Sequence, residues 1–182
     1  MNTSSSNWKT LLSKSLEILR ITTNRILNVK QSGLFSLYKF QWIEDTVCTG
    51  GQPSLHHLEL LHEQGIRTLI NLRRPSEHDT LAFKEKAEEL KIEYFNIPVA
   101  PKNPLDSQVD HFLTLTDNAA NQPLFIHCTA AVRVGAFWMI HRVLRDGWTI
   151  ERAEREAERV GLPLGSSLNR FARKYISRYS GN

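Results

Sequence analysis

Short apolar runs alternate with segments whose apolar residues follow helical spacing along most of this chain. The runs predict strands over residues 67–72, 92–99 and 123–127, and alternation over 37–49 predicts two short strands joined by a turn at Glu44-Asp45. Helical spacing, with Ser54, Ser76 and Asp106 as candidate caps, predicts the helices between and after these strands. The helices cover about residues 55–64, 77–90, 107–116, 133–145, 150–160 and 167–179.

This order of elements predicts an α/β domain. Strands that alternate with helices are typical of a central, mostly parallel sheet with helices on both faces, which gives three layers. Leu124-Phe125-Ile126 is apolar throughout, as expected of a central strand buried on both faces. Ligands of such sheets bind beyond the carboxyl ends of the strands. Cys128 lies at such an end, directly after the predicted central strand.

The first part of the chain has a different pattern from the rest. We expect a tail and an amphipathic basic helix over residues 1–36, with the helix near 8–29, and the α/β domain over 37–182. Six lysines and arginines stand against Glu17 alone in the first forty residues. The helix either docks on the domain or makes a weak contact with a membrane surface. The Ser/Thr-rich basic start also matches an organellar transit peptide.

Composition narrows the class of protein. The chain has 182 residues, a net charge of +4 and only two cysteines, Cys48 and Cys128. Two cysteines do not make a disulfide framework, so we expect free thiols and a cytoplasmic protein. We find no apolar run long enough to cross a membrane. Since no basic cluster is interleaved with aromatic residues, we expect no nucleic-acid partner. The oligomeric state is open.

The chemistry is concentrated between Phe125 and Gly135. A strand ends in His127-Cys128, a short loop follows, and Arg133 opens an apolar helix. A helix N-terminus offers unpaired amide donors and a positive dipole end, which bind anions and lower the pKa of a cysteine placed there. The planar fork of an arginine suits phosphate oxygens. The segment therefore predicts a cysteine nucleophile inside an anion cradle, with a buried core cysteine as the alternative.

Four segments together resemble the cysteine-dependent phosphatases, and among them a bacterial family of domains similar to protein-tyrosine and dual-specificity phosphatases. Relatives of that family are also fused to β-lactamase-like hydrolases. The resemblance covers residues 40–178. Its segments are Thr49-Gly50-Gly51-Gln52-Pro53, Thr68-Leu69-Ile70-Asn71-Leu72-Arg73, Asn96-Ile97-Pro98-Val99 and His127 to Gly135.

The resemblance implies a phosphatase that acts through a phosphocysteine on a phosphorylated protein, such as one carrying phosphotyrosine, or on a small phosphomonoester. Cys128 would be the nucleophile, and Arg133 with the backbone of Thr129, Ala130, Ala131 and Val132 would bind the phosphate. His127 and Gln52 would support the loop. Asp106 is the candidate acid, with a helix cap as its alternative role. No metal or other cofactor is implied.

The loop departs from the pattern of the larger superfamily in three ways. Four residues rather than five separate Cys128 from Arg133, alanines stand at Ala130 and Ala131 where glycine is usual, and Val134 replaces a hydroxyl-bearing residue. These departures predict slow breakdown of a phosphocysteine. They also keep open a rhodanese-like sulfurtransferase with a persulfide on Cys128, and a catalytically weak phosphate-binding module.

Other residues have two interpretations each. Arg73 and Arg74 follow a strand and either face the same pocket or lie in solvent. Cys48 is either a resolving thiol for Cys128 or a buried strand residue. The histidines His56, His57 and His62 lack the spacing of a zinc site, which favours surface positions.

Overall fold

The computed structural model describes residues 33–77 and 79–180. The tail and amphipathic helix expected before residue 33 lie outside the described residues. Ser36–Asn182 forms one compact unit. Its sheet contains β1 (Gln41–Glu44), β2 (Val47–Gly50), β3 (Thr68–Asn71), β4 (Glu93–Asn96) and β5 (Leu124–His127), in the spatial order β1-β2-β5-β3-β4.

The register of the sheet brings four strand ends together. Strands β2, β5, β3 and β4 are parallel, and β1 is antiparallel to β2. His127 is paired with Gly50 on one side and with Asn71 on the other, and Asn71 is paired with Asn96. The carboxyl ends of all four parallel strands therefore lie at one edge of the sheet, where a ligand site is expected.

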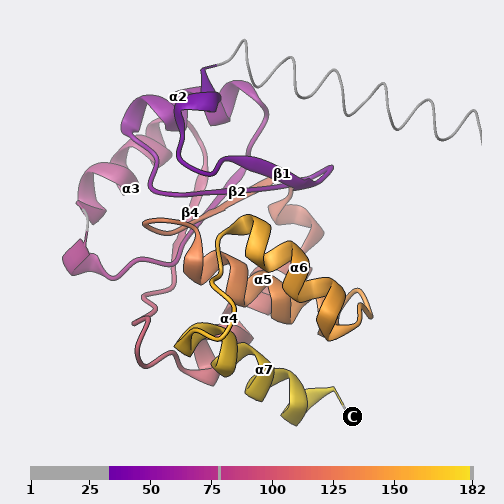
Figure 1. Ribbon diagram of the computed structural model, residues 1–182. Helices are drawn as coiled ribbons and strands as arrows, with labels where there is room; N and C mark the ends of the chain where they lie inside the picture. Colours follow the sequence, from indigo (N-terminus) through magenta and orange to yellow (C-terminus); the bar gives the residue numbers. More distant parts are fainter. Residues whose placement is uncertain (1–32, 78, 181–182) are drawn as a thin grey trace, which may run out of the picture. The chain divides into compact units, whose positions relative to one another are not determined.

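Helices cover both faces of the sheet (Figure 1). One face carries α2 (Leu55–Glu63) and α3 (Thr80–Glu89). The other face carries α4 (Asp106–Asp117), α5 (Val132–Leu144), α6 (Ile150–Val160) and α7 (Ser167–Tyr179). Short 3₁₀ helices lie at Leu34–Ser36, Pro75–Glu77 and Ala119–Asn121. The predicted three-layer α/β fold with a central β5 is confirmed.

Most predicted helix ends lie within one residue of the observed ones, but the start of α3 and the predicted cap of α4 are wrong. Ser54 caps α2 as expected, because its side chain accepts a hydrogen bond from the amide of His57. Asp79, not Ser76, caps α3 and accepts from the amide of Ala82. The chain around Ser76 instead forms a 3₁₀ turn, Pro75–Glu77. Leu105 is the cap residue of α4, so Asp106 is the first helical residue rather than the cap.

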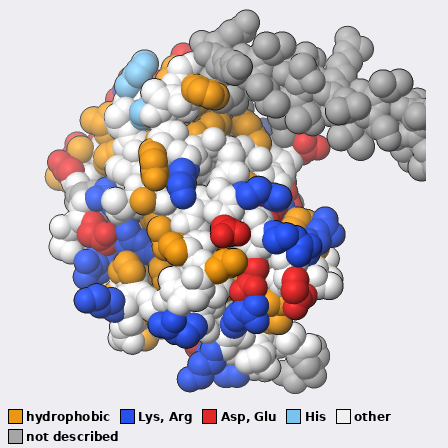
Figure 2. Space-filling model, viewed as in Figure 1, with side chains coloured by type: hydrophobic (Ala, Val, Ile, Leu, Met, Phe, Trp, Pro, Cys, Tyr) orange, Lys and Arg blue, Asp and Glu red, His pale blue; other side chains and the backbone are white. Residues whose placement is uncertain are grey.

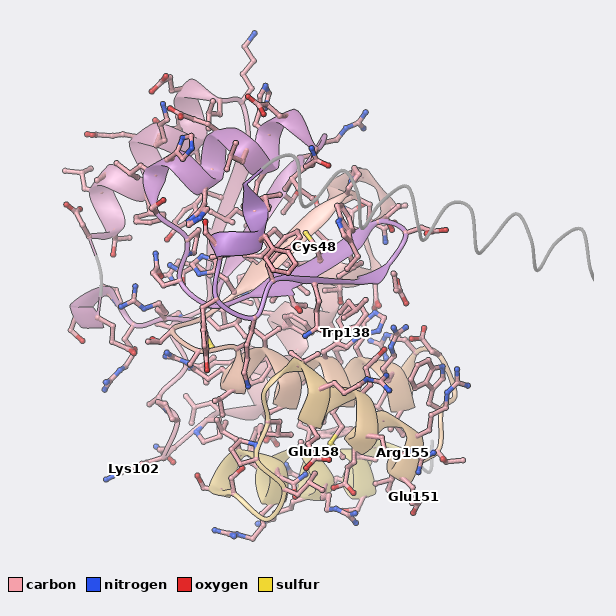
Figure 3. All side chains as sticks on the ribbon, turned by 45° about the horizontal axis from the view of Figure 1, so that its top comes forward. Cys48, Lys102, Trp138, Glu151, Arg155 and Glu158 are labelled. Carbon is pink, nitrogen blue, oxygen red and sulfur yellow. The ribbon has the colours of Figure 1, made fainter. Side chains whose placement is uncertain are left out.

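Helix α5 lies at the centre of the layer formed by α4, α5, α6 and α7. Its residues from Arg133 to Arg142 are all buried, as expected of a helix that packs on the sheet and on two other helices. A Cβ atom at Gly135 would lie 2.8 Å from the carbonyl oxygen of Ala157, so glycine allows α6 to approach closely. The outer side of α6 is charged, with Glu151, Arg155 and Glu158 pointing away from α5 (Figure 3).

Basic and acidic side chains are interspersed over the face seen in Figure 2. Three arginines, by contrast, are buried inside the fold: Arg73, Arg133 and Arg142. Burial of a charged group is costly unless it is paired, so each of these arginines needs a partner. Within the described residues, no helix is long and apolar enough to cross a membrane.

Candidate active site

The loop between β5 and α5 is a tight connection that holds Cys128 at the carboxyl edge of the sheet. Cys128 is 1% exposed and follows directly after β5. Ala131 has a φ of 62°, in the left-handed region that favours glycine, and its carbonyl accepts from the amide of Gly135. Helix α5 then begins at Val132, one residue earlier than predicted. The first amides of α5 and the positive end of its dipole thus lie beside the cysteine loop.

Arg133 is fixed by an ion pair with Glu77 that the sequence did not suggest. Its Nη1 and Nη2 donate to the two carboxylate oxygens of Glu77, at 2.9 and 3.0 Å. The hydrogen bonds from Arg133 hold the pKa of Glu77 down, at about 2 against an ordinary 4.5. Glu77 is therefore a carboxylate at neutral pH, and it orients the guanidinium from the side of β3.

The remaining contacts of Arg133 tie it to the cysteine loop. Nη2 donates to the Thr129 hydroxyl at 2.9 Å, and Nη1 donates to the carbonyl oxygen of Val99 at 3.0 Å. Burial lowers the pKa of Arg133, but Glu77 and the Cys128 sulfur outweigh burial and raise it. The guanidinium stays charged next to the sulfur, as an oxyanion site requires.

The Gly51-Gln52 segment packs directly on the loop. The Gln52 amide donates to the carbonyl oxygen of Thr129 at 3.1 Å. A Cβ atom at Gly51 would lie 2.9 Å from that same oxygen, so only glycine permits the approach. The expectation that this loop reaches the cysteine loop from the neighbouring strand is met, although the supporting role of Gln52 stays a prediction.

The sequence allows the same two interpretations for Arg73 and Arg74, a place in the site or a place in solvent. In the structure the two side chains have different environments. Arg73 is 8% exposed, and its Nη1 donates to Oε1 of Gln52 at 2.5 Å while Nη2 donates to the carbonyl oxygen of Glu77. Arg74 is half-exposed and binds the Glu77 carboxylate through Nε at 3.1 Å. Arg73 is therefore buried between Gln52 and the main chain of Glu77, whereas Arg74 binds the same residue from a more exposed position.

His127 and Asp106, two further candidate residues, are each held by contacts within the fold. His127 ends β5, is fully buried and stacks on the ring of Phe125, with centroids 5.5 Å apart. Asp106 at the start of α4 is held by Arg178 of α7, with both carboxylate oxygens engaged at 2.8 Å. Its role as the acid stays a prediction, and that role would require this ion pair to open.

Cys48 lies within β2, and the three histidines His56, His57 and His62 lie on α2. Cys48 is buried in β2 opposite Phe125 (Figure 3), and its sulfur donates to the carbonyl oxygen of Leu124. His57 takes part in the cap of α2, and His56 pairs with Glu59. Within residues 33–77 and 79–180, no group of three histidine, cysteine or acidic side chains is placed to hold a metal ion.

Glu77 is a residue of this site that sequence reasoning missed. Glu77 lies four residues beyond Arg73, in the segment that leaves the carboxyl end of β3. A carboxylate following a strand at this edge was the available signal.

The fold, the cysteine loop and the buried arginine define a phosphatase of the protein-tyrosine and dual-specificity class. The chain belongs to the family described as the DSP-PTPase phosphatase fused to NAD+ kinase, whose model matches residues 26–166. No curated protein matches the chain in sequence.

Solved structures share the fold. A DUF442 protein of Shewanella putrefaciens CN-32 is 19% identical, with a TM-score of 0.68 over 85% of this chain and 98% of that one. The core catalytic domain of the PP-IP phosphatase Siw14 from S. cerevisiae is 20% identical, with a TM-score of 0.66 over 79% and 86%. TpbA of P. aeruginosa is 18% identical, with a TM-score of 0.61 over 78% and 84%.

Proposed function

We propose that this protein hydrolyses a phosphomonoester, of a protein or of a small molecule, with Cys128 as its nucleophile. The observation that carries the proposal is the convergence of three features on one loop. These are the sulfur of Cys128, the N-terminus of α5, and the Arg133 guanidinium held against Thr129. Together they provide a nucleophile and the positive field that phosphoryl transfer needs.

The first step transfers the phosphoryl group to sulfur. The Cys128 thiolate attacks phosphorus, the bond from phosphorus to the ester oxygen breaks, and the leaving alcohol takes up a proton. The amides of residues 129–133 and Arg133 stabilise the charge on the transferred oxygens. Glu77 acts through Arg133: it sets the orientation of the guanidinium and does not touch the phosphoryl group.

The second step regenerates the free enzyme. Water attacks the phosphocysteine, the bond from sulfur to phosphorus breaks, and inorganic phosphate leaves with the thiolate restored. Val134, fully buried on α5, offers no hydroxyl to assist the departing sulfur. We therefore expect this step to limit turnover and phosphocysteine to accumulate.

One comparison tests the proposal against both alternatives. The purified chain and its Cys128→Ser variant are incubated with p-nitrophenyl phosphate, and separately with thiosulfate and cyanide. Phosphate release that the variant loses supports the proposal. Thiocyanate formation without phosphate release supports a sulfurtransferase, and phosphate binding without either product supports a binding module. Full phosphate release by Cys128→Ser would overturn the role of the cysteine.

A further inference from the structure

Arg73 differs from the other buried arginines in having no carboxylate on its guanidinium. Arg133 is held by Glu77, and Arg142 by the three carboxylates Glu44, Asp146 and Glu156. Arg73 has two neutral acceptors, the side chain of Gln52 and the main-chain oxygen of Glu77. Its Nε is buried and, within the described chain, has no hydrogen-bond partner. Burial lowers the pKa of Arg73, and the nearby negative charge of Glu77 offsets this only in part.

The position of Arg73 is next to the reacting centre and separate from Arg133. Gln52 joins Arg73 to the cysteine loop. Its side-chain oxygen accepts a hydrogen bond from Arg73, and its main-chain N–H donates to the carbonyl oxygen of Thr129. After burial, the charge of Glu77 has the largest effect on the pKa of Arg73, followed by the charges of Arg133 and Cys128. Glu77 binds Arg133 through its carboxylate and Arg73 through its carbonyl oxygen, so this residue stands between the two guanidinium groups.

We infer that Arg73 binds a second phosphoryl group of the substrate, adjacent to the one that Cys128 attacks. The inference rests on the proposed function and names its substrate class: a diphosphate ester, or a monoester with a second phosphate close by. A second dianion would place a negative charge directly on the guanidinium and accept the Nε–H in the planar geometry that arginine offers. Glu77 contacts both guanidinium groups, so a substrate with two linked phosphoryl groups would place one at Arg133 and the other at Arg73.

Binding of small anions tests the inference without any turnover. Isothermal titration calorimetry of the full chain compares inorganic phosphate with methylenediphosphonate, a diphosphate analogue that is not hydrolysed. We expect the diphosphonate to bind about tenfold more tightly, which is the gain expected of a charge-assisted hydrogen-bond pair. In Arg73→Gln this preference should fall to about twofold or less, with phosphate affinity changed less than about threefold.

Arg67 provides the matched control, since it precedes β3 as Arg73 follows it and is exposed. Arg67→Gln removes the same charge at the opposite end of the strand and should keep the full preference. Arg73→Lys keeps the charge but loses the planar fork, so its preference should fall severalfold, and this variant serves if Arg73→Gln does not fold. Thermal unfolding of each variant is recorded in parallel.

Three results would overturn the inference: equal affinity of the wild type for both anions, equal weakening of both by Arg73→Gln, or an unchanged preference in Arg73→Lys. Equal weakening would mean that Arg73 holds the reacting phosphoryl group itself. The proposed phosphatase activity and the proposed second phosphoryl position can each be rejected without the other. A diphosphonate preference without phosphatase activity rejects only the catalytic proposal, and activity without the preference rejects only the second phosphoryl position.

Discussion

Glu77 binds Arg133 through both carboxylate oxygens, and this ion pair joins the segment after β3 to the first turn of α5. The pair lies across the carboxyl edge of the sheet, where the two strands β3 and β5 end side by side. A bidentate carboxylate fixes the plane of a guanidinium as well as its position. Arg133, the proposed phosphate-binding residue, is therefore oriented by the fold itself.

This ion pair makes stability depend on pH. The pKa of Glu77 is about 2 in the fold against an ordinary 4.5, so its contribution is complete above about pH 4.5 and is lost as the pH falls toward 2. The difference corresponds to about 3 kcal/mol at about 1.4 kcal/mol per pH unit. In urea unfolding, Glu77→Gln should cost about 3 kcal/mol at pH 7 and progressively less below pH 4.5.

Glu88→Gln is the control for that experiment. Glu88 is exposed and lies 3.8 Å from Lys84, so its removal should change stability by less than about 1 kcal/mol at either pH. A Glu77→Gln deficit that stays constant from pH 7 to pH 2.5 would contradict the assignment of the low pKa to Glu77.

Ala131 stores backbone strain in the cysteine loop. A left-handed φ at a residue with a Cβ costs about 1–2 kcal/mol, which glycine avoids. Ala131→Gly and Ala136→Gly both remove a buried methyl group and both add the chain entropy of glycine, but only the first relieves strain. We expect Ala131→Gly to be the more stable of the two by about 1–2 kcal/mol in urea unfolding. Equal stabilities would contradict the strain.

Arg142 links β1 to α5 and α6 and should be critical for stability. Its guanidinium binds the carboxylates of Glu44, Asp146 and Glu156 and lies 4.3 Å from the centre of the Trp148 ring. Arg142→Ala leaves the buried carboxylate of Glu156 and the partly exposed carboxylates of Glu44 and Asp146 unpaired, so we expect a loss of about 3–5 kcal/mol.

Arg145→Ala removes a neighbouring arginine whose partner, Asp117, is exposed. It should cost less than about 1 kcal/mol in the same denaturant titration. Similar losses for Arg142→Ala and Arg145→Ala would show that the buried cluster does not contribute as described.

Substrates with good and poor leaving groups distinguish the two roles considered for Asp106, general acid and ion-pair partner of Arg178. An acid matters most when the leaving group is a poor one, so an acidic Asp106 predicts that Asp106→Asn slows hydrolysis of an alkyl phosphate about 100-fold and of p-nitrophenyl phosphate far less. An Asp106 that serves only the ion pair with Arg178 predicts equal small effects on both substrates. In that case Arg178→Gln would reproduce the effects of Asp106→Asn.

Much of the architecture could be predicted from the sequence because it depends on local pattern. Helix α6 and helix α7 match their predicted ranges, since Thr149 and Ser166 are strong caps and the apolar spacing is regular. The cysteine loop could also be predicted, because strand, cysteine, arginine and helix follow one another directly.

The contacts across the sheet edge could not be predicted in this way. Both Ser76 and Asp79 are suitable caps for α3, and local pattern does not choose between them. In the fold, the preceding residue pair Arg73 and Arg74 binds Glu77 in a 3₁₀ turn, which leaves Asp79 to cap the helix. Local contacts within the 3₁₀ turn therefore accompany the later start of α3, whereas a long-range ion pair supplies the partner of Arg133.

Trapping of the covalent intermediate tests the nucleophile most directly. The chain is mixed with a radiolabelled phosphate monoester, quenched in acid and assayed for label on the protein, beside Cys128→Ser and Cys48→Ser. We predict label on the wild type and on Cys48→Ser and none on Cys128→Ser. Label that persists in Cys128→Ser, or an actively hydrolysing wild type that never acquires label, would contradict a phosphocysteine at Cys128.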